Sequence, residues 1–77
     1  GIEISPNPTT GLVSITLGKR LEGVHLEVFD MQGRRVQTVD YQSTEQLDVM
    51  LEGSAGIYLV RLEDNEGNSA SMKVIKQ

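Results

Sequence analysis

The amino-acid sequence predicts an all-β fold, a seven-stranded antiparallel β-sandwich that is immunoglobulin-like in outline. Apolar and polar residues alternate in seven short segments, residues typical of turns separate these segments, and no segment carries the apolar stripe of a helix. Without crossover helices the strands pair antiparallel, and a chain of 77 residues closes one core best as two packed sheets. A flattened barrel is the alternative arrangement.

The first four expected strands cover residues 1–5, 12–17, 24–30 and 35–40. Successive side chains of a strand point to opposite faces, so a period of two marks a strand with one buried face. His25 alternates with apolar residues and is expected on the polar face of its strand. In the second and third segments, the residues expected to face the core are Val13, Ile15, Leu17, Val24, Leu26 and Val28.

The other three expected strands cover residues 46–51, 57–63 and 70–76. The segment 57–63 is apolar on both faces, which is typical of a central strand. Tyr58 alternates with the core positions of this segment and is therefore expected to be buried. In the last segment Met72 and Val74 lie on one face, and Lys73 and Ile75 lie on the other.

Two of the expected turns share a pattern in which aspartate stands three residues before glycine, at Asp30 and Gly33 and at Asp64 and Gly67. Aspartate at the first turn position accepts hydrogen bonds from the backbone ahead of it, and glycine supplies a positive φ. We therefore expect a hairpin at each place. Both prolines lie in the segment 5–11, "SPNPTTG", which is expected to be a turn outside the strands.

Composition excludes several classes of function. The chain has no cysteine, which excludes a disulfide framework and a thiolate zinc site. Its formal net charge of −4 argues against binding to nucleic acid or to an anionic membrane surface, because both require a concentrated basic patch. No apolar run approaches the length that spans a bilayer, so we expect no direct membrane insertion.

The sequence offers no candidate catalytic residues. His25 is the only imidazole, and its place in mid-strand predicts a surface histidine rather than a metal ligand or a base. The segment 64–69, "DNEGNS", lacks the alternating acidic ligands and the distal glutamate of a calcium loop, so we expect a plain hairpin turn. The carboxylates are spread over separate turns and strands. We expect no enzyme activity, no metal and no cofactor.

Charge is distributed unevenly along the chain. Residues 1–70 carry 5 basic and 11 acidic side chains, whereas residues 71–77 carry Lys73 and Lys76 and no acid. In one interpretation, these lysines protect an edge strand against unwanted pairing. In the other, the edge strand offers its backbone, side chains and charge to a receptor that binds by strand addition.

A set of segments carries a resemblance to a known family. They are "SPNPTTG" followed by "LVSITL", then "VFDMQGRRV", the "LD" of "QLDVML", "GIYLVRL", and "KVIKQ" at the end. In their order, spacing and terminal placement they resemble the C-terminal sorting domains of the type IX secretion system of Bacteroidetes, the type A sorting domains of the Por secretion system. The match spans nearly the whole chain.

The resemblance implies that residues 1–77 form a single sorting domain of a larger secreted protein, the cargo. Such a domain directs its cargo through the outer-membrane translocon, after which a sortase-like surface peptidase typically removes it. The implied partners are the translocon, this peptidase and the attached cargo. The implied locations are the periplasm in transit, and then the outer membrane, the cell surface or the medium.

The recognition element of the family lies towards the end of the domain. The resemblance carries it over to Gly56, Tyr58, Arg61, Lys73, Val74, Lys76 and Gln77 as partner-binding residues. An alternative function is that of a non-catalytic, immunoglobulin-like spacer or adhesion module of a surface protein, in which the tail only protects an edge. Exposed edges in so small a domain also allow a strand-exchanged homodimer.

Overall fold

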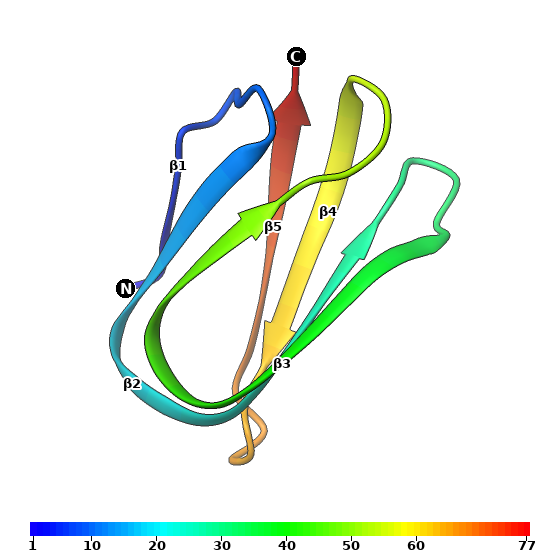
Figure 1. Ribbon diagram of the computed structural model, residues 1–77. Helices are drawn as coiled ribbons and strands as arrows, with labels where there is room; N and C mark the ends of the chain where they lie inside the picture. Colours follow the sequence, from blue (N-terminus) through cyan, green and yellow to red (C-terminus); the bar gives the residue numbers. More distant parts are fainter.

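The computed structural model describes all 77 residues and contains five strands joined in one curled antiparallel sheet (Figure 1). The strands are β1 (Glu3–Ser5), β2 (Leu12–Phe29), β3 (Arg35–Met50), β4 (Gly56–Glu63) and β5 (Ser69–Lys76). The all-β class and the antiparallel pairing are confirmed. The count of seven strands was wrong, and an immunoglobulin-like sandwich of two separate sheets is not what the structure shows.

The count differs because two pairs of expected strands are continuous. The expected strands 12–17 and 24–30 correspond to the two halves of β2, which ends one residue earlier, at Phe29. The expected strands 35–40 and 46–51 correspond to the two halves of β3, which ends at Met50. The connecting stretches of β2 and β3 stay paired with each other, with an irregular register between Thr16 and Leu21. A polar stretch between two alternating segments looks like a loop in the sequence, but here it remains part of the ladder.

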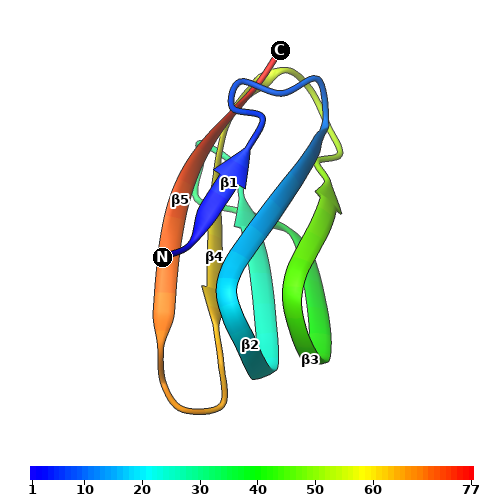
Figure 2. The ribbon, with the colours of Figure 1, turned by 90° about the vertical axis from the view of Figure 1, so that its left-hand side faces the viewer.

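The curl of the sheet follows from a bend in β2. Gly18 and Gly23 have φ angles of 85° and 64°, which residues with a side chain rarely adopt. Gly18 lies within the irregular stretch of the ladder, and Gly23 lies two residues after it. The bend folds the long β2–β3 hairpin over, so that its two halves lie on opposite sides of the molecule (Figures 1 and 2). The turn between β4 and β5 contacts this bend, because Asn65 N donates to Glu22 O at 3.0 Å.

Strand β2 organises the sheet because it pairs with β1, β3 and β4. Its first half pairs with β1 and with the end of β3, and its second half pairs with the start of β3 and with β4. Strand β4 lies between β2 and β5, which confirms the expected central strand. Strand β5 ends the order of the sheet, as expected for the last segment.

The core lies inside the curl and confirms the alternation of the sequence. Fourteen buried hydrophobic side chains form one cluster, which includes all six residues expected to face the core from β2. Leu26 is completely buried and is paired with Val39 of β3 on one side and Leu62 of β4 on the other. Tyr58 is 7% exposed, which confirms its expected burial.

Both hairpin turns form as the sequence predicts. Asp30 Oδ1 accepts hydrogen bonds from the backbone N–H groups of Gln32 and Arg34 at 2.9 and 3.0 Å. Asp64 Oδ1 does the same for the N–H groups of Glu66 and Asn68, both at 2.9 Å. Both turns have glycine at positive φ, so the plain hairpin expected for "DNEGNS" is confirmed.

One side-chain amide links the two ends of β3. Gln37 Nε2 donates to Met50 O at 2.9 Å, and Glu52 N donates to Gln37 Oε1 at 3.0 Å. An amide side chain can satisfy a carbonyl and an N–H group together, as a neighbouring strand would. Gln37 therefore holds the first half of β3 against the segment that follows its second half.

Replacing Leu26 with alanine should cost about 2 to 5 kcal/mol of unfolding free energy, because it leaves a cavity between three strands. The unfolding free energy of a domain of 77 residues is about 4 to 12 kcal/mol in total, so the variant should be close to unfolding. Urea denaturation followed by circular dichroism measures the loss. The matched control is Leu59→Ala on the outer face, where the side chain is 42% exposed and a change within about 0.5 kcal/mol is expected.

Candidate functional site

The family-derived candidate residues divide between the two faces of the β4–β5 pair. Tyr58 and Val74 are directly paired across the two strands and point into the core, with 7% and 0% exposure. The Tyr58 hydroxyl donates to Ser54 O at 2.6 Å and so ties β4 to the loop before it. Their burial suits a role in the fold, and a partner cannot contact Val74 without opening the sheet.

Lys76 is held by the loop between β3 and β4. Its Nζ donates to Leu51 O at 2.9 Å and to Gly53 O at 2.7 Å, and the residue is only half exposed. Three carbonyls of this loop, those of Leu51, Gly53 and Ser54, are therefore satisfied by Lys76 and Tyr58. Lys76 therefore anchors β5 to the loop that precedes β4.

The N-terminal turn covers the edge of the C-terminal strand. We call residues 6–11 the cover segment. Asn7 Nδ2 donates to Lys73 O and Asn7 Oδ1 accepts from Ile75 N, both at 2.9 Å. Thr9 N donates to Ile75 O and Gln77 N donates to Thr9 O, both at 2.8 Å. The turn after β1 and the end of β5 are thus hydrogen-bonded side by side (Figure 2).

The cover segment is itself firmly held. Thr9 is 2% exposed, its Oγ1 donates to Leu12 O at 2.6 Å, and the same oxygen accepts from Gly11 N at 3.0 Å. Leu51 N donates to Gly11 O at 2.9 Å, which joins the segment to the end of β3. Sequence reasoning identified "SPNPTTG" as a turn but missed its contact with the tail, because the partners lie more than 60 residues apart.

The outward residues of β4 and β5 form a second group. Ile57 pairs with Ile75 and Leu59 pairs with Lys73, and these four side chains lie on one face as neighbours. We call them the outer patch. Leu59 and Ile75 are 42% and 41% exposed, and Ile57 is half-buried. Lys73 is exposed and forms no ion pair within 4 Å in the structure.

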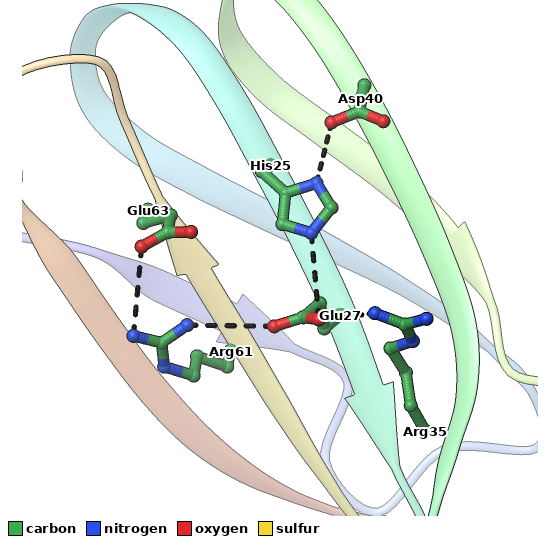
Figure 3. A network of polar contacts seen from close by, with 6 residues as sticks. All are labelled: His25, Glu27, Arg35, Asp40, Arg61 and Glu63. Carbon is green, nitrogen blue, oxygen red and sulfur yellow. Dashed lines mark hydrogen bonds and ion pairs between the residues drawn. The ribbon is translucent and has the colours of Figure 1, made fainter.

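Arg61 continues this face into a network of ion pairs across β3, β2 and β4 (Figure 3). Glu27 is its centre, with Oε2 at 3.2 Å from Arg35 Nη1 and Oε1 at 3.6 Å from Arg61 Nη1. Arg61 Nη2 also lies 3.7 Å from a carboxylate oxygen of Glu63. The network neutralises both arginines, in contrast to Lys73.

His25 joins the same network from the polar face of β2, where the sequence places it. Its Nδ1 lies 2.6 Å from Asp40 Oδ1, and its Nε2 lies 3.7 Å from Glu27 Oε2. The hydrogen bond to Asp40 and the charge of both carboxylates raise the pKa of His25 above 6.5. The hydrogen bond from Arg35 in turn lowers the pKa of Glu27 below its ordinary value. When it is protonated, His25 bridges two carboxylates.

Gly56 lies at the start of β4 beside an open cleft of about 500 Å³. The cleft separates the turn after β2 from the loop before β4, and Tyr58 also contributes to its wall. Thus Gly56, Tyr58, Lys76 and Gln77 gather at one end of the molecule, whereas Arg61 and Lys73 lie on the outer face. The structure has no group of three or more potential ligands that could hold a metal ion, and no helix able to cross a membrane.

Replacing Asn7 with alanine should lower the unfolding free energy by about 1 to 3 kcal/mol, since two hydrogen bonds to β5 are lost. Urea denaturation measures the change, and hydrogen exchange should show faster exchange at Ile75 N. Asn65→Ala is the matched control, because the Asn65 side chain makes no hydrogen bond in the structure. Equal stability of the two variants would contradict the role assigned to Asn7.

The unfolding free energy should fall through His25 as the pH rises from about 6.5, the ordinary pKa of histidine, into the alkaline range. Its folded pKa is raised, so its stabilising contribution is present below the unfolded value and is lost as the pH rises through the folded pKa. The His25→Gln variant should show a smaller decrease over the same range. An unchanged pH dependence in this variant, measured by urea denaturation, would argue against the bridge between Asp40 and Glu27.

Comparison with known proteins agrees with the placement of these segments. Residues 3–77 match a family described as the secretion system C-terminal sorting domain. No curated protein matches the chain. Because the match covers nearly all of the sequence, from the first strand through the cover segment to the tail, the chain belongs to the family of type IX secretion C-terminal sorting domains.

Proposed function

We propose that this domain is the export signal of a larger cargo protein and that the type IX outer-membrane translocon recognises its C-terminal strand. Membership of the sorting-domain family supports this function. The structural observation that best supports this function is that β5 is held in place on several sides. It is hydrogen-bonded to β4, to the cover segment and, through Lys76, to the loop before β4. A receptor therefore meets a tail of defined shape.

The domain acts by binding and not by catalysis. The charged residues of its outer face, Glu27, Arg35, Arg61 and His25, are engaged with one another in ion pairs. Groups that pair with each other in such a network hold neighbouring strands together, which is a structural role. Any catalytic activity belongs to the attached cargo.

The path of the cargo follows from the proposed signal. The cargo crosses the periplasm, passes the outer membrane through the translocon, and reaches the cell surface or the medium. A sortase-like peptidase then removes the domain by cutting the chain before the folded part. The compact sheet is consistent with this order of events. Its hydrogen-bonded backbone is protected from the peptidase, whereas the chain that precedes it is accessible to cleavage.

Fusing residues 1–77 to the C-terminus of an unrelated periplasmic protein should move that protein to the cell surface or the medium. The host must possess the type IX machinery, and cell fractionation with immunoblotting measures the location. The reporter without the domain and the fusion in a strain without the translocon serve as controls. Both should remain in the periplasm.

Retention of the fusion in the periplasm of the competent host would contradict the proposed signal. That result would favour the alternative of an immunoglobulin-like spacer or adhesion module. A folded fusion is the condition for either conclusion, and resistance of the domain to limited proteolysis tests it.

A further inference from the structure

The backbone edge of β5 that faces away from β4 is already hydrogen-bonded to the cover segment. In an antiparallel ladder alternate residues direct their backbone groups to opposite sides. On the side of β5 away from β4, the groups of Lys73 O, Ile75 N, Ile75 O and Gln77 N are bonded to Asn7 and Thr9. A receptor strand that paired with this part of the tail would need these same groups. Strand addition there requires removal of the cover segment, which Thr9 and Gly11 anchor.

The side chains of the outer patch remain available. Single exposed apolar residues are ordinary on a protein surface, whereas neighbouring ones form a patch that favours association. Here Ile57 and Ile75 are direct cross-strand neighbours, and Leu59 lies across from Lys73. This arrangement places an apolar surface beside an ammonium group.

Charge distinguishes this lysine from the other cations around it. Arg35 and Arg61 share Glu27 in the ion-pair network, and the Nζ of Lys76 is bound to two carbonyls. Lys73 has no such partner, although the chain as a whole is acidic. A carboxylate on a bound protein would complement it, and charge complementarity favours one partner and one orientation.

We infer that the outer patch is the surface by which a receptor protein recognises the tail. The receptor places apolar side chains on Leu59 and Ile75 and a carboxylate on Lys73, and the cover segment keeps β5 from being bound through its edge. This inference rests on the proposed export function. In this mode of recognition the receptor contacts the side chains of the outer patch and does not add a strand to the edge of β5.

The test uses the reporter fusion described above, with variants of the outer patch. Lys73→Glu and Leu59→Ser should each lower the exported fraction about tenfold or more, because each removes a contact near the centre of the interface. Lys19→Glu and Leu12→Ser are the matched controls at exposed positions away from the patch, and they should be exported normally. Thermal unfolding of all four variants verifies that they remain folded.

Asn7→Ala separates contact between faces from strand addition, since it frees Lys73 O and Ile75 N at the edge of β5 without changing the outer patch. Export of this variant should not exceed that of the unchanged fusion. Increased export with Asn7→Ala, or normal export with both Lys73→Glu and Leu59→Ser, would overturn the inference while leaving the export function intact. Retention of the unchanged fusion would overturn both.

Discussion

The structure depends on the bend that folds the β2–β3 hairpin over on itself. Strand β2 has 18 residues with buried side chains along nearly its whole length, whereas β4 has 8 residues and pairs only with its second half. A straight hairpin would therefore leave the apolar face of its first half exposed to water. The loss of this buried apolar area would lower the unfolding free energy of a domain whose core is already small. The bend at Gly18 and Gly23 lets the two halves enclose one core.

A curled sheet leaves edges, and polar side chains close them at two places. Gln37 joins the two ends of β3, and Asn7 joins the N-terminal turn to β5. Each amide uses both its donor and its acceptor on backbone groups, which protects an edge without adding a strand. In the mode of recognition that we propose, this protection of the C-terminal strand leaves side chains, rather than the backbone, as the means by which a partner distinguishes the tail.

The charges of the outer face divide into two kinds. His25, Glu27, Arg35 and Arg61 neutralise one another across three strands, so they contribute to the shape of the face more than to its field. Lys73 lies on the neighbouring strand without a counter-charge and beside exposed apolar side chains. Surface ion pairs contribute little stability individually, so an unpaired lysine costs the fold little and remains free for a partner.

By itself, the sequence determined the strand class, the core and the turns. Alternation with a period of two identifies Leu26 and Tyr58 as buried, and the aspartate–glycine spacing predicts both hairpins, because these patterns are local. Tertiary structure decided the number of strands, since pairing across the bend at residues 18–23 depends on a partner strand and not on local propensity. It also decided which candidate residues a partner can contact. Val74 and Lys73 are adjacent in the chain, yet one faces the core and the other faces water. The backbone edge of their strand is closed by Asn7 and Thr9, which lie near the opposite end of the chain.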